Sequence, residues 1–191
     1  MTTPVTLDPQ QARSRLHELT VIDVRTPGEY AGGHIPGALN IPLDRLGRAL
    51  PEIRGAAERG EVLVVCASGA RSESACRTLA ESGVHTATLA GGTGAWAAQG
   101  NDLDRSEGGT RATWGMERQV RLTAGSLVLL GLALGEFVHP AFRLLPAGIA
   151  GGLVFSAVTN TCGMAAMLAK LPHNRPRQAD LEATLTRLRA G

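Results

Sequence analysis

The segment from Cys66 to Ser72 contains the residues best suited to chemistry. It reads Cys-Ala-Ser-Gly-Ala-Arg-Ser and follows an apolar run, Val62–Val65, that predicts a buried strand, while a helical pattern begins near Ser72. Sites in open parallel sheets form beyond the carboxyl ends of strands, which is where this cysteine stands. Small residues let such a loop wrap closely, so that its N–H groups can point at the sulfur as an anion-binding nest.

The surroundings of Cys66 favour an anionic sulfur. The N-terminus of the following helix contributes partial positive charge, and Arg71 contributes a full charge. We therefore expect Cys66 to be a thiolate, the reactive form of cysteine. An alternative is a buried structural cysteine, but a Gly/Ser loop with an arginine would contribute nothing to a hydrophobic core. The residues predicted to bind the substrate are Ala67, Ser68, Gly69, Ala70, Arg71 and Ser72.

The length of the loop bears on the reaction. A cysteine, a loop and an arginine also occur in cysteine phosphatases and related arsenate reductases, whose loops are one residue longer than the four residues between Cys66 and Arg71. A shorter loop makes a narrower ring of N–H donors, which suits a single sulfur atom better than a tetrahedral phosphate. The loop therefore favours sulfur transfer over phosphate hydrolysis.

The elements around this loop predict an α/β fold. Buried strands are expected at Thr20–Val24, Val62–Val65 and Thr86–Leu89, and helices are expected to begin after Asp8 and near Ser72, with more helix around 93–99. Strands that alternate with helices predict a parallel sheet with helices on both faces.

Four other residues receive structural interpretations. Asp23 and Arg25 are expected to form a structural pair, and His34 is expected to hydrogen-bond locally before a turn. Cys76 lies one helix into the domain and is interpreted as a small buried residue, with a resolving thiol as the less favoured alternative.

Composition excludes several classes of protein. The 191 residues are 43% hydrophobic and 19% charged, which excludes a disordered chain, and a net charge of +2 argues against a general nucleic-acid binder. Three widely spaced cysteines without a Cys-x-x-Cys pair argue against a zinc site, so no metal or cofactor is predicted. No cleavable signal peptide is expected. Residues 1–110 carry a net charge of −3 and residues 111–191 a net charge of +5, so two differently built parts are joined.

The second part predicts a pair of transmembrane helices. Leu122–Gly135 has no charged residue in 14 positions, and Leu144–Ala169 has none in 26. As a helix, the longer run would extend about 39 Å, more than the roughly 30 Å of a hydrocarbon core. We expect a hairpin that turns around His139–Arg143, with Glu136 and Arg143 neutralising each other. Two buried helices of a soluble domain are the alternative, but the longer run lacks a polar stripe.

Flanking charges predict the orientation of this hairpin. Basic residues are concentrated before and after it, whereas the turn has Arg143 alone, so the positive-inside rule places both termini in the cytoplasm. Gly131-x3-Gly135 and Gly148-x3-Gly152 could serve the hairpin, a dimer or neither. In the tail, Asp180–Arg189 places three leucines on one face of a short interfacial or packing helix.

Ordered motifs over the first hundred residues resemble the single-domain rhodanese family of sulfurtransferases. The matching segments are Ile22–Arg25, Glu29-Tyr30, Gly33–Ala38, Asn40–Pro42, Cys66–Ser72 and Gly91-Gly92 through Trp96. The second part resembles YgaP-type inner-membrane proteins, on the segments Glu117–Arg121, Gly135–Pro140 and Cys162–Met164. The expected domains are a rhodanese-like cytoplasmic domain (1–100), a linker (101–117), two transmembrane helices within 118–170 (about 119–139 and 144–168) and a cytoplasmic tail (171–191).

The resemblance implies a two-step exchange of sulfur. Cys66 would take sulfur from thiosulfate or a similar anion as a persulfide and pass it to a thiol, or to cyanide in assays. Ala67 stands where the family often has a basic or polar residue, which weakens attraction for a dianionic donor. Cys162, in the second apolar run, is a possible second sulfur site. The alternative function is a binding or transport module for a sulfur-containing anion, in which the first domain feeds an oligomeric hairpin in the bilayer.

Overall fold

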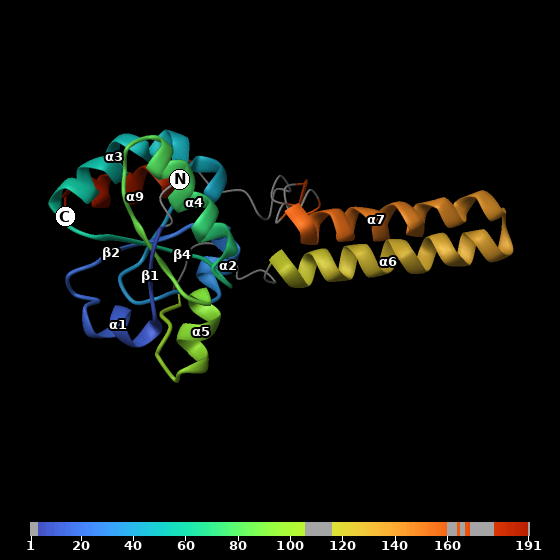
Figure 1. The fold of residues 1–191 in the computed structure, drawn as a ribbon, viewed down its shortest axis with the longest axis horizontal. Coiled ribbons are helices and arrows are strands. Elements are labelled where there is room, and N and C mark those ends of the chain that lie inside the picture. The colour runs from blue at the N-terminus through green and yellow to red at the C-terminus, as the bar shows by residue number, and fades with distance from the viewer. Residues whose placement is uncertain (1–3, 106–115, 160–163, 165–166, 169–177, 191) are drawn as a thin grey trace. The chain divides into compact units, whose positions relative to one another are not determined.

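The chain forms two compact units. The computed structural model describes residues 4–105, 116–159, 164, 167–168 and 178–190 (Figure 1). Unit 1 comprises residues 1–113 together with 175–191, and unit 2 comprises residues 114–174. Residues 160–163, which include Cys162, lie outside the described residues.

Unit 1 is built on a five-stranded sheet in the order β1-β5-β4-β2-β3, and every neighbouring pair of strands is parallel. This architecture confirms the predicted α/β class. The strand that leads into Cys66, β4, lies in the middle of the sheet, as expected for a strand that is apolar throughout. The strands are β1 (Val5–Leu7), β2 (Thr20–Asp23), β3 (Leu39–Asn40), β4 (Val62–Val65) and β5 (Ala87–Leu89).

Helices cover both faces of this sheet. Capping boxes begin two of them: Asp8 pairs with Gln11 in α1, and Thr26 pairs with Glu29 in α2. The helices of unit 1 are α1 (Pro9–Ser14), α2 (Pro27–Ala31), α3 (Leu46–Arg59, after the 3-10 turn η1 at Leu43–Arg45), α4 (Ala70–Glu81), α5 (Gly92–Ala98) and α9 (Gln178–Ala190).

Residues of β4 alternate between two hydrophobic cores. Val62, Val64 and Cys66 belong to the core that α3, α4 and α9 cover, whereas Leu63 and Val65 belong to the core on the other face. The alternation is the ordinary period of a strand. Cys66 therefore points toward the α4 face because it continues the register of β4.

The C-terminal helix α9 is part of unit 1. Its leucines Leu181, Leu185 and Leu188 are buried in the core beside α3, so the predicted apolar face of the tail packs on the domain (Figure 1). Polar contacts frame this packing, since Arg48 pairs with Glu182, Arg189 pairs with Glu52, and Arg59 donates a hydrogen bond to the Leu188 carbonyl. Residues 178–190, assigned from the sequence to a separate tail, thus complete the hydrophobic core of the first domain.

Unit 2 is a helical hairpin of α6 (Met116–Phe137) and α7 (Leu144–Thr159), joined through the 3-10 turn η2 (Pro140–Arg143). The turn lies where the sequence predicts it, and Arg143 forms the expected ion pair with Glu136, at 2.7 Å between Nη2 and Oε2. Two stretches, Arg118–Phe137 and Pro140–Val158, are long and apolar enough to cross a membrane. Most of their large apolar side chains are exposed, and Phe137 is 86% exposed.

The two small-residue patterns of the hairpin differ in what they face. A Cβ on Gly131 would lie 2.6 Å from Cδ of Pro146, and one on Gly135 would lie 2.6 Å from Cγ of Arg143. No atom lies within 4 Å of a Cβ built on Gly148 or on Gly152. The first pattern therefore lets the chain close the hairpin, and the second contributes nothing to its described contacts.

Candidate active site

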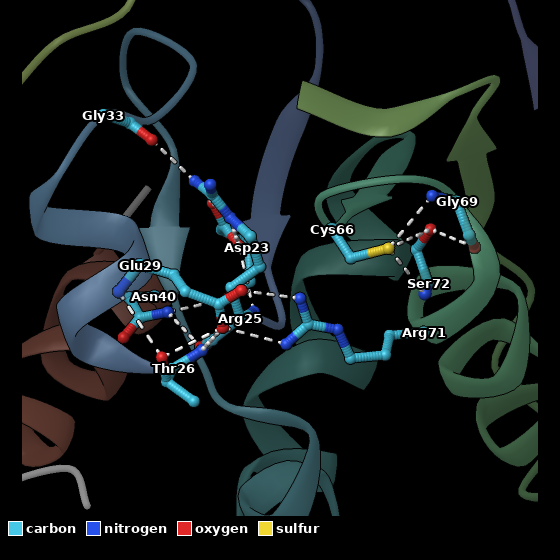
Figure 2. Close-up of polar contacts among 10 residues, drawn as sticks. All are labelled: Asp23, Arg25, Thr26, Glu29, Gly33, Asn40, Cys66, Gly69, Arg71 and Ser72. Carbon is cyan, nitrogen blue, oxygen red and sulfur yellow. Dashed lines mark hydrogen bonds and ion pairs between the residues drawn. The ribbon is translucent and has the colours of Figure 1, made fainter. Parts of the chain in front are cut away.

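Cys66 is completely buried directly after β4, and two backbone N–H groups point at its sulfur. Gly69 donates to Sγ at 3.1 Å and Ser72 at 3.4 Å, as Figure 2 shows. The turn between them needs glycine, because Gly69 has a φ of +102°. Both donors stand at the start of α4, whose N-terminus carries partial positive charge. This cradle stabilises negative charge on sulfur.

The start of α5 holds the same loop from its carbonyl side. Thr93 N–H donates to the Cys66 carbonyl at 2.8 Å, and Gly94 N–H donates to the Ala67 carbonyl at 3.0 Å. The approach is so close that a Cβ on Gly92 would lie 2.2 Å from the Cys66 oxygen, at a φ of +59° that itself favours glycine. The loop is thus fixed by a turn about 25 residues further along the chain.

The hydroxyl of Ser72 connects the sulfur to β5. The Cys66 thiol donates to Ser72 Oγ at 3.5 Å, Ser72 Oγ donates to the Gly69 carbonyl at 2.8 Å, and Thr88 Oγ1 donates to Ser72 Oγ at 2.7 Å. All these groups are buried. Ser72 was predicted as a site residue, whereas Thr88 was not, because no motif marks a single threonine in a strand.

Arg71 turns toward α2 and pairs with a buried carboxylate. Its two terminal nitrogens donate to the two oxygens of Glu29, both at 2.9 Å (Figure 2). Glu29 also accepts from the N–H and hydroxyl of Thr26. Burial by itself would lower the pKa of Arg71, but hydrogen bonds and charge from Glu29, with charge from Cys66 and Asp23, raise it above its ordinary value. Arg71 is therefore permanently charged, and Glu29 balances that charge.

The rest of the loop is open to solvent. Ser68 and Ala70 are exposed and Ala67 is half-buried, so a small reactant can approach the loop from this side. None of these three side chains carries a charge. Binding of a donor or acceptor would therefore rest on backbone N–H groups and on Arg71.

Neighbouring polar residues have structural roles, as predicted. Asp23 and Arg25 form a buried pair, with Nη2 and Oδ2 2.6 Å apart, and Arg25 also donates to the Gly33 carbonyl. The side-chain amide of Asn40 donates to the carbonyls of Asp23 and Arg25, both at 2.9 Å. His34 places its Nδ1 2.9 Å from the Tyr30 carbonyl. These contacts fix the segments on either side of α2, the helix that carries Glu29.

The other cysteines are not part of this cradle. Cys76 is buried in α4, its thiol donates to the Ala87 carbonyl at 3.5 Å, and burial raises its pKa. That places it as the small buried residue that the sequence indicated. The possible second sulfur site, Cys162, lies outside the described residues. Within the described ranges, no group of three or more His, Cys, Asp or Glu side chains could hold a metal ion.

Comparisons with known families match both units. Residues 8–99 match the Rhodanese-like domain, and residues 115–177 match the transmembrane domain described as "Inner membrane protein YgaP-like". The order of the two matches along the chain is the order of the Cys66 loop and the apolar hairpin.

Three relatives extend these matches. "Uncharacterized protein slr1261" of Synechocystis sp. is 38% identical over 91% of this chain and 95% of its own length. A protein named "Sulfurtransferase" from Allochromatium vinosum is 35% identical over 53% of this chain and 96% of its own length. "Thiosulfate sulfurtransferase PspE" of Escherichia coli is 37% identical over 37% of this chain and 67% of its own length.

Proposed function

Because the chain belongs to the rhodanese family and carries a YgaP-like inner-membrane domain, we propose that it is a membrane-anchored sulfurtransferase whose sulfur carrier is Cys66. The observation that carries the proposal is the pair of N–H groups, from Gly69 and Ser72, aimed at the buried sulfur. Such donors stabilise both the attacking thiolate and the anionic persulfide that follows it.

The first half-reaction loads Cys66. The thiolate attacks the outer sulfur of thiosulfate, a bond forms between Sγ and that sulfur, and the sulfur–sulfur bond of the donor breaks. Sulfite leaves with the bonding electron pair, and the added sulfur remains on Cys66 as an anionic persulfide. This is covalent catalysis by an activated nucleophile. The negative charge moves by one sulfur–sulfur bond, from Sγ to the outer sulfur, and the N–H groups of the loop are proposed to stabilise both anions.

The second half-reaction removes the sulfur from Cys66. A thiolate acceptor attacks the outer sulfur of the persulfide, takes it as its own persulfide, and returns Cys66 to the thiolate. Cyanide does the same in an assay and leaves as thiocyanate. The exposed edge of the loop at Ser68 and Ala70 supports access by an acceptor from solvent.

Arg71 is proposed to orient an anionic donor. It is the charged residue of the loop, but Glu29 already occupies its guanidinium at 2.9 Å. A dianion such as thiosulfate would have to compete with a buried carboxylate for these donors, and Ala67 offers no further charge. We therefore expect thiosulfate to bind with low affinity. A donor with a smaller negative charge should be weakened less by competition with Glu29.

The hairpin is proposed to place both termini in the cytoplasm. The packing of α9 on α3 supports one part of this proposal, that both termini lie on the same side, because the chain before and after the hairpin contributes to one hydrophobic core. Two segments of one core belong on the same side of a membrane. An alkaline phosphatase reporter inserted after Val138 should be active outside the membrane and one fused to the C-terminus inactive; the reverse pattern would contradict the orientation.

A direct assay tests the function. Full-length protein in lipid nanodiscs should produce thiocyanate from thiosulfate and cyanide, because both half-reactions then turn over. Cys66→Ser should abolish the product, while Cys76→Ser serves as the matched control, since its thiol is buried away from the cradle. Equal activity in Cys66→Ser and the wild type would reject Cys66 as the carrier.

A further inference from the structure

Thr88 is a buried polar residue in the middle of β5. It is 1% exposed, and its hydroxyl donates to Ser72 Oγ at 2.7 Å. Its neighbours Ala87 and Leu89 belong to the core on the opposite face of the sheet, so strand alternation turns Thr88 toward α4 and the loop. Valine would fill the same volume in a parallel strand without a polar group. A hydroxyl at this place therefore has a use other than packing.

The three contacts of Ser72 define what its hydroxyl can do. A serine hydroxyl has one proton to donate and two lone pairs that accept. One lone pair takes the proton of Thr88, and the other faces the Cys66 sulfur at 3.5 Å, where the thiol donates to it. The serine proton goes to the Gly69 carbonyl at 2.8 Å. This arrangement suits a neutral thiol.

An anionic sulfur requires a different arrangement of the same atoms. Without its proton, the sulfur would face a lone pair of Ser72, which is unfavourable, so the serine proton has to turn from the Gly69 carbonyl to Sγ. The Gly69 carbonyl keeps a partner, because the N–H of Glu73 donates to it at 2.9 Å. No buried group is left unpaired by the rotation.

We propose that Thr88 is a positioning residue that, by donating to Ser72 Oγ, holds and polarises the serine hydroxyl so that it donates to the anionic sulfur of Cys66. The contact with Thr88 is available in both arrangements, since it occupies a lone pair and not the serine proton. A hydroxyl that accepts one hydrogen bond donates the next one more strongly. Thr88 thus acts through Ser72 and not by touching sulfur or substrate.

The inference rests on the proposed role of Cys66 as a nucleophile, and its test needs no sulfur donor. The rate at which iodoacetamide alkylates Cys66 in the full-length protein, followed on the Cys66 peptide by mass spectrometry, reports the fraction of thiolate as pH varies. If the protein transfers no sulfur but the alkylation profile is as expected, the proposed function is contradicted and the role of Thr88 is not.

Thr88→Val should move the pH midpoint of alkylation upward by about 0.5 pH unit, and Ser72→Ala should move it by about 1 unit. Thr88→Ser keeps a hydroxyl and should restore the wild-type midpoint. Thr86→Val is the matched control, because Thr86 is also buried but its hydroxyl lies beside the Cys76 thiol and makes no hydrogen bond to Ser72, so the alkylation midpoint of Cys66 should not move.

The double variant gives the sharpest result. In a Ser72→Ala background, Thr88→Val should add no further shift, because the residue acts only through the serine hydroxyl. An unmoved midpoint in Thr88→Val, or a full shift that persists without Ser72, would overturn the proposal. If Thr88→Val does not fold, Thr88→Ala replaces it in both backgrounds with the same expected results.

Discussion

The two units place the same residue types in opposite environments. Leu185 in α9 is 3% exposed within the core of unit 1, whereas Leu129 in α6 is 70% exposed on the hairpin. In water the first arrangement is favourable and the second is not, because apolar surface is stabilised by removal from water. An exposed apolar surface on both hairpin helices suits lipid as the solvent. Burial thus separates a domain that folds around its site from one that is built for a bilayer.

The largest expected effect concerns Gly92 in unit 1, which lets the start of α5 lie close against the Cys66 loop. We expect Gly92→Ala to reduce sulfur transfer by about 100-fold or more, since the added Cβ would lie 2.2 Å from the Cys66 oxygen and displace the loop. Thiocyanate production measures the effect. Gly47→Ala in α3 is the control, because no atom lies within 4 Å of its added Cβ, and its activity should remain. Near wild-type turnover in Gly92→Ala would show that this contact does not hold the loop.

Substitution of Leu185 and Leu129 tests how much burial contributes to stability in the two units. Leu185→Ala should lower the free energy of unfolding of unit 1 by about 3 kcal/mol, because it removes a side chain from a closed core. Leu129→Ala should change it by less than about 0.5 kcal/mol. Urea unfolding of the nanodisc-embedded protein, followed by fluorescence of Trp96 in a Trp114→Phe background, measures both. Equal effects of the two substitutions would contradict the assignment of α9 to the domain core.

Two glycines test the closure of the hairpin. Gly131→Leu should destabilise the paired helices by about 1–2 kcal/mol, because Pro146 lies where the new side chain would begin. Gly148→Leu should have no such effect, since its added side chain points into open space. Titration with sodium dodecyl sulfate, followed by circular dichroism, measures the stability of the hairpin. A larger loss in Gly148→Leu would instead indicate that α7 contacts a second chain.

The smallest expected effect concerns acid and the docking of α9. The hydrogen bond from Arg189, opposed in part by burial, lowers the pKa of Glu52 below its ordinary value of 4.5. A carboxyl whose pKa is lower in the folded state stabilises it above the ordinary value and loses this contribution as pH falls through the folded value. The free energy of unfolding of the wild type should therefore exceed that of Arg189→Gln by less than about 1 kcal/mol at pH 6, and in urea unfolding this difference should shrink as pH falls below 4.5. A difference that grows in acid would contradict the pair.

The sequence predicts those parts of the site that depend on neighbouring residues. The apolar run before Cys66, the glycine turn and the helix after it are local patterns, and the structure has them at the expected places. The strands β1 and β3 are three and two residues long, too short for a periodic pattern, and were not predicted. The helix α3 was not predicted either.

Contacts between distant segments could not be predicted from these patterns. Arg71 hydrogen-bonds to Glu29, which lies 42 residues away in the sequence, and Thr88 hydrogen-bonds to Ser72, which lies 16 residues away. The capping box of α2 identifies Glu29 as an N-terminal helix residue, but the neighbouring sequence gives no indication that its carboxylate also pairs with an arginine. The docking of α9 on α3 spans more than 120 residues, as the pair of Arg48 and Glu182 illustrates. Such pairs depend on the topology of the sheet, and periodic patterns in the sequence do not determine that topology.

The central claim is that Cys66 carries sulfur, and intact-protein mass tests it most directly. After treatment with thiosulfate and removal of excess donor, the wild type and Cys76→Ser should each gain the mass of one sulfur atom, and cyanide should remove it. Cys66→Ser should gain none, and Cys162→Ser shows whether a second sulfur depends on the hairpin. A wild type that gains no sulfur, or a gain that persists in Cys66→Ser, would contradict the account.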